Sequence, residues 1–366
     1  MRTGWDSRLA SLIASFAVVL LLATPAFTQD CPELVGSLMG PGLSDVAVSS
    51  GYAYATGDPW GSGERSLRVI EVSDPYHPVE VGSIDFDPGW PTAVAVSGSY
   101  AYVAGVTPAI AGLFVIDVSA PSAPVQVGFV GHAGGGRGWD VAVSGDYAYV
   151  VTQGAYGTLS VIDVSTPSAP VLVGSLWGGG GYGVAVSGGY AYVAAGDGLA
   201  VIDVSEPSAP GWAGELVPVG GWGVAVSGGY AYTAGGYSDY FPMGLYVIDV
   251  SEPSAPVEVG FLGTPTATCD VAVSRGYAYV AVNEDYRSLG AGLHVIDVSI
   301  PSAPVEVGSY ATVGGGLPGY WEGVAVSDGY VFLVNLGGLF IFRECGPLFA
   351  DGFESGDTSA WSATVP

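Results

Sequence analysis

A unit of about 40 to 50 residues recurs along most of the chain, and this repetition constrains the possible folds more than any other feature. Its most compact copy runs from Gly183 to Gly214 and reads GVAVSGGYAYVAAGDGLAVIDVSEPSAPGWAG. This copy contains four short apolar runs, rich in β-branched or aromatic residues and bounded by Gly, Ser or Pro. Runs of this kind are typical of β-strands. Four strands per repeat at this period predict the blades of a β-propeller.

The first strand of the unit follows the motif Val-Ala-Val-Ser, which is followed by a two-residue turn and an aromatic residue. The motif occurs seven times, beginning at Val46, Val94, Val141, Val184, Val224, Val271 and Val324. Every turn has a glycine at a central position, as two-residue hairpins with positive φ require. We therefore predict an all-β fold, a seven-bladed β-propeller of four-stranded antiparallel blades.

The seventh copy lacks its fourth strand, because the sequence leaves the pattern after Cys345. The segment Pro32–Ser37 resembles a fourth strand and precedes the first copy. We expect this N-terminal strand to complete the last blade, which closes the ring and removes an open edge strand. In the repeat frame Cys31 and Cys345 flank one turn, where an exported protein allows a disulfide. Cys269 then remains as a buried free thiol; the alternative is that all three cysteines are unpaired.

The N-terminal segment has the pattern of a signal peptide. Arg2 and Arg8 precede the uncharged apolar stretch Leu9–Ala23, which is short for a transmembrane helix. The sequence thus predicts a signal peptide over residues 1–28, a propeller over residues 31–345, and no transmembrane segment in the mature chain. Residues 346–366 fall outside the repeat and predict a short, acidic, disordered tail. We expect the protein to be secreted or held at the cell surface.

The charge balance narrows the range of partners. Lysine and arginine together number 8 against 34 acidic residues, so the formal net charge is −26. A surface with so few cations lacks the basic patch that nucleic acids need, and we expect no nucleic-acid partner.

Two motifs resemble a known family. The run Leu245-Tyr-Val-Ile-Asp-Val-Ser-Glu-Pro-Ser-Ala-Pro and the run Asp270-Val-Ala-Val-Ser resemble the LVIVD-repeat proteins, which are bacterial exported or surface β-propellers. The resemblance covers roughly residues 31 to 345. It implies the fold and an extracellular or cell-surface setting. The family has no established common activity, so the resemblance assigns no catalytic residue.

One face of the predicted ring carries the connections that vary from blade to blade, and variable loops on a regular scaffold are the usual carriers of function. On three consecutive blades the first strand begins with an aromatic residue: Trp139, Tyr182 and Trp222. With Asp140, these residues predict a ligand-binding platform for a glycan, a peptide or a surface protein. The alternative interpretation is that the rings only fill the channel mouth and pack between blades.

Acidic residues form two further groups. Asp45, Asp140 and Asp270 begin the first strands of blades 1, 3 and 6, and are weak candidates for holding a hydrated cation, because no calcium-loop pattern accompanies them. A second, repeated aspartate precedes the Val-Ser-x-Pro turns, where a carboxylate accepts hydrogen bonds from turn amides. This second group comprises Asp117, Asp163, Asp203, Asp249 and Asp297.

Catalytic signals are sparse. His132, Arg137 and Asp140 place a base, a cation and an acid within nine residues, which makes them weak catalytic candidates. The sequence has no Gly-x-Ser-x-Gly motif, Cys/His metal cluster or phosphate-binding loop, and we expect no cofactor. A recognition or scaffolding module is favoured over catalysis. The alternatives are a hydrolase or lyase that uses the His132 region, and a purely structural cell-surface component.

Overall fold

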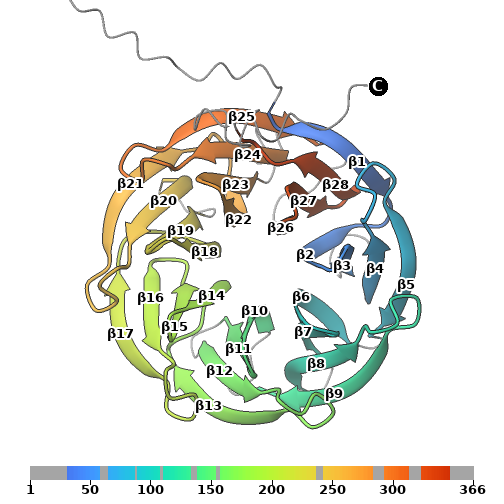
Figure 1. Cartoon of the computed structure of the whole chain (residues 1–366). Helices are drawn as coiled ribbons and strands as arrows, with labels where there is room; N and C mark the ends of the chain where they lie inside the picture. The colour runs from blue at the N-terminus through green and yellow to red at the C-terminus, as the bar shows by residue number, and fades with distance from the viewer. Residues whose placement is uncertain are drawn as a thin grey trace, which may run out of the picture. The chain divides into compact units, whose positions relative to one another are not determined.

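The computed structural model describes residues 31–57, 65–86, 89–107, 110–132, 138–153, 157–235, 242–282, 292–312 and 323–346. Within these ranges 28 strands form seven four-stranded antiparallel sheets arranged around a central axis (Figure 1). This confirms the predicted all-β, seven-bladed propeller. The described part of the chain contains no helix that is long and apolar enough to cross a membrane. The predicted signal peptide and residues 347–366 of the predicted tail lie outside the described residues.

Each blade places its first strand at the central channel and its fourth strand at the outer rim (Figure 1). The inner strands of blades 1 to 7 are β2 (Leu43–Ser49), β6 (Trp90–Ser97), β10 (Gly138–Ser144), β14 (Gly183–Ser187), β18 (Gly223–Ser227), β22 (Thr268–Ser274) and β26 (Gly323–Ser327). The second strands are β3 (Tyr52–Gly57), β7 (Tyr100–Val106), β11 (Tyr147–Thr152), β15 (Tyr190–Ala194), β19 (Tyr230–Gly235), β23 (Tyr277–Val282) and β27 (Tyr330–Asn335). The third strands are β4 (Ser66–Glu71), β8 (Ala111–Asp117), β12 (Thr158–Asp163), β16 (Leu199–Asp203), β20 (Gly244–Asp249), β24 (Gly292–Asp297) and β28 (Gly338–Arg343). The outer strands are β5 (Val79–Asp85), β9 (Val125–Gly131), β13 (Val171–Trp177), β17 (Gly211–Leu216), β21 (Val257–Gly263), β25 (Val305–Ala311) and β1 (Glu33–Met39).

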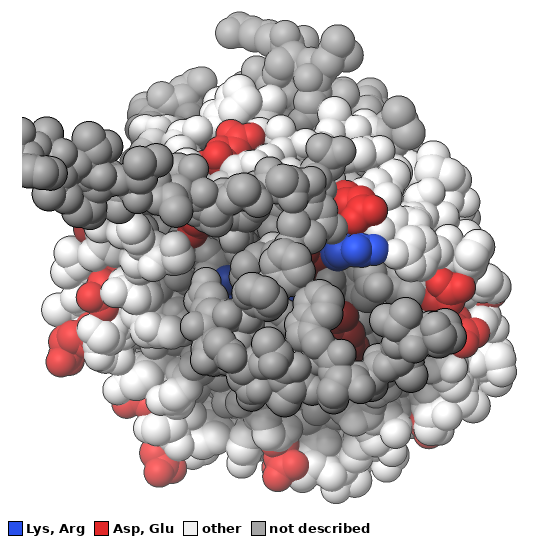
Figure 2. Space-filling model, turned by 45° about the horizontal axis from the view of Figure 1, so that its top comes forward, with Lys and Arg blue, Asp and Glu red and all other residues white. Residues whose placement is uncertain are grey.

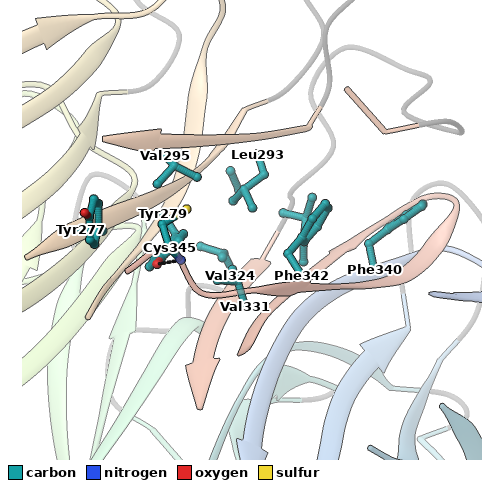
Figure 3. Packing of buried hydrophobic residues seen from close by; sticks show 11 residues of the cluster. Tyr277, Tyr279, Leu293, Val295, Val324, Val331, Phe340, Phe342 and Cys345 are labelled. Carbon is teal, nitrogen blue, oxygen red and sulfur yellow. Dashed lines mark hydrogen bonds between the residues drawn. The ribbon is translucent and has the colours of Figure 1, made fainter. Parts of the chain in front are cut away.

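The hydrophobic core is divided into seven clusters, and each cluster fills the space between two neighbouring blades. In the cluster between blades 6 and 7, Tyr279 and Leu293 pack against Val331 and Phe342 (Figure 3). Both faces of the middle strands are therefore covered, which explains why those strands read as nearly continuous apolar runs. Because fully burying one such side chain is worth about 1.5–3 kcal/mol, these clusters are the main force that holds the blades together.

The two-residue hairpins between inner and second strands have the backbone that their glycines predict. In the hairpin from β22 to β23, Arg275 has φ of 50° and Gly276 has φ of 81°. Positive φ at both central residues matches the right-handed twist of the strands that the turn joins.

The ring closes in blade 7, as the sequence predicts. Strand β1 pairs antiparallel with β28, from Glu33 opposite Arg343 to Met39 opposite Gly338. Cys31 and Cys345 form a disulfide with 5.8 Å between their Cα atoms, and Cys269 is a buried free thiol. These findings confirm the predicted pairing.

A second contact ties this closure to the neighbouring blade. The backbone N–H of Cys345 donates a hydrogen bond of 2.9 Å to the hydroxyl of Tyr279 in blade 6 (Figure 3). Both atoms are buried, so the bond satisfies two polar groups that would otherwise be costly to bury.

At the outer rim a glycine of every outer strand lies directly against the next blade, and we call these contacts the rim locks. A methyl group on this glycine would overlap a backbone carbonyl oxygen in the turn between the third and fourth strands of the next blade. For six blades the carbonyl belongs to a proline, and for blade 6 it belongs to Cys31. The glycines are Gly36, Gly82, Gly128, Gly174, Gly214, Gly260 and Gly308. The Pro-Ser-Ala-Pro turn and the glycine of the fourth strand thus form one repeated joint.

Candidate functional site

A cavity of about 80 Å³ lies where the chain enters the inner strands, and we call it the mouth cavity. All seven blades contribute one or two of these entering residues to its wall. The wall includes Trp139, Tyr182 and Trp222 together with Asp45 and Asp140, and the sixth blade adds Asp270 and Cys269. The structure therefore brings to one cavity the residues that the sequence singles out as ligand-binding candidates and as weak metal candidates.

Local backbone irregularity helps to aim these side chains at the cavity. In blades 1, 2, 3 and 6 the pairing of the inner strand with the second strand shifts register at the entering residues. In blade 3 the shift falls between Gly138 and Asp140, so that Trp139 has no partner across the ladder. A β-bulge of this kind redirects a side chain and is frequent beside binding sites.

Trp139, Tyr182 and Trp222 form a continuous row of rings, which we call the aromatic arc. The ring centroids of Trp139 and Tyr182 are 5.8 Å apart, and those of Tyr182 and Trp222 are 5.9 Å apart with the planes inclined by 30°. All three side chains are half-buried. The Tyr182 hydroxyl accepts a hydrogen bond from the side-chain amide of Gln153, which fixes the middle ring. The rings line the cavity without filling it.

The three mouth aspartates, Asp45, Asp140 and Asp270, each join two neighbouring blades. One carboxylate oxygen accepts a hydrogen bond from the next amide of its own strand, and the other accepts one from the inner strand of the following blade. For Asp140 these donors are the N–H groups of Val141 and Val184, each at 2.7 Å. Equivalent pairs are Val46 and Val94 for Asp45 at 2.8 and 2.7 Å, and Val271 and Val324 for Asp270 at 2.8 and 2.9 Å.

The environment of the mouth aspartates disfavours their charge. Burial raises the pKa of Asp45 to about 6. Burial and the negative charge of Asp45 together raise the pKa of Asp270 to about 7. The pKa of Asp140 is raised well above its ordinary value by burial, and then by the charges of Asp45 and Asp270. The two amide donors on each carboxylate oppose this rise without cancelling it. The mouth cavity is therefore a place where ionised carboxylates are poorly solvated and repel one another.

These carboxylates do not form a chelating cluster. Among the described residues, no three His, Cys, Asp or Glu side chains are close enough together to hold one metal ion. The aspartates sit on blades 1, 3 and 6, and their hydrogen bonds run between blades along the wall. The arrangement thus fits a role in joining blades better than direct ligation of a metal.

Of the catalytic candidates that the structure describes, Asp140 lies in the cavity wall and His132 does not. The side chain of His132 is buried, 7% exposed, and lies 3.5 Å from the position that a Cβ on Gly138 would take. It is packed beside the start of β10 and is not part of the cavity wall. Arg137 lies outside the described residues, and Asp140 is held by two backbone amides. Among the described residues these candidates therefore form no shared acid–base site.

The sequence did not reveal that the mouth aspartates join blades, although it contained a signal for this role. Each of them is followed, at the same position of the next blade, by a residue with little or no side chain: Ala93, Gly183 or Gly323. A methyl group on Gly183 would overlap the carbonyl of Trp222, and one on Gly323 would overlap Asp45, so these glycines leave room for the blade that follows them. The rule would be visible only after the seven inner strands had been aligned by blade.

The turn aspartates behave as the sequence predicts. Each accepts a hydrogen bond of 2.9 Å from the backbone N–H of the serine two residues later. Hydrogen bonds from Ser165, first from its hydroxyl and then from its backbone, lower the pKa of Asp163. The structural role predicted for Asp117, Asp163, Asp203, Asp249 and Asp297 is confirmed.

Comparison with protein families identifies the repeat. The LVIVD repeat matches six segments, residues 43–86, 88–131, 135–177, 178–216, 221–264 and 265–312. The chain belongs to the LVIVD repeat family. The six matched segments correspond to blades 1 to 6 of the LVIVD propeller, and the seventh blade, which joins both ends of the propeller, carries the degenerate copy. No sequence among the curated proteins matches the chain.

Solved structures share the architecture of this LVIVD propeller at low sequence identity. A chain of the mitotic checkpoint complex has 14% identity and a TM-score of 0.65, with 88% of this chain and 98% of that chain covered. A functionally unknown protein from Desulfotomaculum acetoxidans has 13% identity and a TM-score of 0.58, covering 77% and 97%. The computationally designed Ika8 protein has 11% identity and a TM-score of 0.56, covering 85% and 100%. At such identities the likeness shows the fold alone.

Proposed function

We propose that this LVIVD propeller is an exported, non-catalytic recognition module that binds a glycan, a peptide or a surface protein at the mouth cavity. The observation that carries this proposal is that the aromatic arc lines an open cavity. Trp139, Tyr182 and Trp222 present large, rigid, half-exposed ring surfaces, which give contact area at little cost in side-chain entropy. Rings that served only as packing would be expected to fill the channel mouth.

The chemistry of the wall supports binding over catalysis. His132 is buried and is not part of the cavity wall, and each oxygen of Asp140 accepts one hydrogen bond from a backbone amide, which joins this carboxyl to the wall between blades. A hydrolase or lyase would need a base and an acid that face a common substrate position. A purely structural role explains the aspartate bridges but gives no reason for a row of half-exposed rings.

Export is supported by two independent features. The apolar stretch Leu9–Ala23 follows a basic start, and the ring is closed by a disulfide between Cys31 and Cys345. Structural disulfides persist in oxidising compartments. When the full chain is expressed in a bacterial host, N-terminal sequencing of the exported protein should place the first residue close to position 29. Retention of the intact chain in the cytoplasm would contradict export.

The binding proposal is tested with glycan and peptide arrays. The double variant Trp139→Ala/Trp222→Ala should lose the ligands that the parent protein binds, because each ring contact is worth about 0.5–1.5 kcal/mol beyond burial. The matched control is Trp177→Ala/Trp212→Ala, which removes two tryptophans that are 58% and 51% exposed on the outer strands β13 and β17. Equal binding by both double variants would place the site elsewhere on the molecule.

A further inference from the structure

We propose, building on the binding role above, that the mouth cavity receives an alkylammonium group, which is carried by a small amine or by a lysine side chain of a partner protein. The juxtaposition of three aspartates with a row of aromatic rings around one small cavity points to this chemistry.

The wall of the mouth cavity is acidic. The described wall of the cavity contains three carboxylate-bearing residues, Asp45, Asp140 and Asp270, and no Lys, Arg or His. The other described wall residues are aromatic rings, hydroxyls, a thiol and residues with little side chain. In Figure 2 acidic groups are more widespread than basic ones on the surface in view, and atoms of both kinds are visible at the central hollow. A cation is attracted to such a wall, whereas an anion is repelled by it.

The mouth aspartates can accept further hydrogen bonds. In Asp45, Asp140 and Asp270 each carboxylate oxygen accepts one hydrogen bond from a backbone N–H. An ionised carboxylate has about four lone-pair sites on its two oxygens. An ammonium group can therefore donate to a mouth aspartate without breaking the bridge between blades. The propeller need not open to admit the ligand.

The residues of the cavity wall favour an organic cation over an inorganic one. No three ligating side chains of the described residues converge on one point, so a bare metal ion finds no chelating set. The faces of Trp139, Tyr182 and Trp222 attract cations through the quadrupole of the ring, and they also bury the carbon atoms next to an ammonium nitrogen. An inorganic ion that keeps its water shell gains little from the rings.

The volume of the mouth cavity limits the size of the group that it can hold. A cavity of about 80 Å³ has room for roughly five to eight waters, since one water needs about 10–15 Å³ when volume is measured in this way. That space suits an ammonium head group with a few carbon atoms. The rest of the ligand would lie outside the cavity, on the face of the ring that carries the variable connections.

The affinity should depend on pH in a defined direction. The ionisable groups that face the cavity are Asp45 from β2, Asp140 from β10 and Asp270 from β22, with the Tyr182 phenol and the Cys269 thiol. The other inner strands contribute no ionisable group among the described residues. An ammonium ion binds the ionised carboxylates, so protons leave the aspartates as the ligand enters. Affinity should rise as pH increases from about 5 to 8, and calorimetry in buffers of different ionisation enthalpy should detect the released protons.

The deciding measurement is isothermal titration calorimetry of the purified protein at pH 8 with choline, n-butylammonium and the uncharged carbon analogue of choline, in which a quaternary carbon replaces the nitrogen. We expect both cations to bind and the uncharged analogue to bind at least roughly tenfold more weakly. Equal affinity for the uncharged analogue would overturn the ammonium proposal and leave the aromatic binding site standing. If array ligands bind through the aromatic arc while both cations fail, the ammonium proposal also falls alone. If array ligands and cations all fail, the binding role falls with it.

Substitutions inside and outside the mouth cavity test whether choline binds there. Tyr182→Leu should weaken choline binding by roughly tenfold, whereas Trp212→Leu on the outer strand should leave it unchanged. Asp140→Asn should weaken binding and flatten its pH dependence, whereas Asp163→Asn removes the same charge from a distant turn and should do neither. Unfolding curves show whether Asp140→Asn still folds, and the Tyr182→Leu result tests the site independently. Unchanged affinity in Tyr182→Leu would overturn the proposal.

Competition separates the two sources of the ammonium group. A lysine-containing peptide from the array should be displaced by choline and should lose its affinity when the lysine is acetylated. Such a result assigns the cavity to a partner protein. Binding of free amines without any lysine peptide assigns it to a small ligand. A peptide whose affinity survives acetylation contradicts recognition of its ammonium group.

Discussion

At the outer rim every blade meets the next in the same way, whereas at the channel mouth the junctions differ from blade to blade. Each rim lock places a backbone carbonyl of one blade against a glycine of its neighbour, and this contact recurs at all seven junctions. At the mouth an aspartate bridges the junctions of blades 1 and 2, 3 and 4, and 6 and 7. Between blades 2 and 3 the hydroxyl of Thr92 donates to the carbonyl of Gly138 at 2.6 Å instead.

The contrast shows how one ring can keep a uniform spacing of its blades and still vary the side chains at its mouth. The rim determines the spacing of the blades through backbone atoms and glycine, which tolerate no variation in side chain. The mouth can then carry different side chains without endangering closure, because closure does not depend on any one of them. Four predictions test this division of roles.

The largest effect is expected where the rim joint is broken by the chain ends. In blade 7 the disulfide of Cys31 and Cys345 replaces the continuous turn and spans 314 residues of sequence. Cys31→Ala/Cys345→Ala should lower the free energy of unfolding by roughly 5 kcal/mol at most, since loop-closure entropy is lost from the unfolded state. Denaturant titration of this variant beside Cys269→Ala measures the difference. Similar midpoints for the two variants would mean that the disulfide does not hold the ring closed.

A smaller but still large effect is expected at a single rim lock. Strand β17 contains a matched pair of glycines, because a methyl group on Gly214 would overlap the carbonyl of Pro253 and one on Gly211 would meet open space. Gly214→Ala should lower the free energy of unfolding by about 2–3 kcal/mol through overpacking. Gly211→Ala should change it by less than about 0.5 kcal/mol. If the two substitutions cost the same, the rim contacts are not the joints described above.

The mouth aspartates should make stability depend on pH. Asp45 and Asp270 have folded-state pKa values of about 6 and about 7, above the unfolded value near 4, so the folded protein binds more protons between these limits. Their contribution is complete below pH 4 and is lost as the pH rises through 6 and 7. Between pH 5 and 8 Asp270→Asn should reduce this loss by about 2–3 kcal/mol. Parallel pH profiles for parent and variant would contradict the raised pKa.

The smallest effect is expected at the turn aspartates of the rim. The pKa of Asp163 is lowered by its bonds from Ser165, so its contribution is present at neutral pH and is lost only as the pH falls through its folded-state value. Because the side chain is exposed, Asp163→Asn should leave the unfolding midpoint at pH 7 nearly unchanged. A shift as large as that of Gly214→Ala would show that the turn cap matters more than the rim lock.

The fold could be predicted from the sequence because its signals are local and repeated. The Val-Ala-Val-Ser motif and its glycine turn mark each inner strand, and the absence of a fourth strand after Cys345 reveals the closure with Pro32–Ser37. The positions of Trp139 and Tyr182 at the mouth also followed from the repeat frame.

The interactions between blades could not be predicted in the same way. The hydrogen bond that the amide of Val184 donates to Asp140 joins residues 44 positions apart, and no short motif around either residue identifies the pair. Trp90 and Trp177, which lie close to the mouth residues in sequence, are not part of the described cavity wall. Trp90 lies under the guanidinium of Arg65 instead, with 4.8 Å from the guanidinium carbon to the ring centroid, and Trp177 is exposed on β13. Such placements depend on three-dimensional packing that a single sequence does not encode in any short motif.

Because β1 pairs with β28, blade 7 cannot be completed until almost the whole propeller has been synthesised. A ribosome adds about 5–20 residues per second, so the 314 residues between Cys31 and Cys345 take roughly 15–60 seconds to follow. During that interval β1, the first strand of the propeller to be made, still has no sheet to join, because its partner β28 has not been synthesised. The strand that seals the ring is therefore the one that waits longest, and a folding helper would have most to protect at that end of the nascent chain.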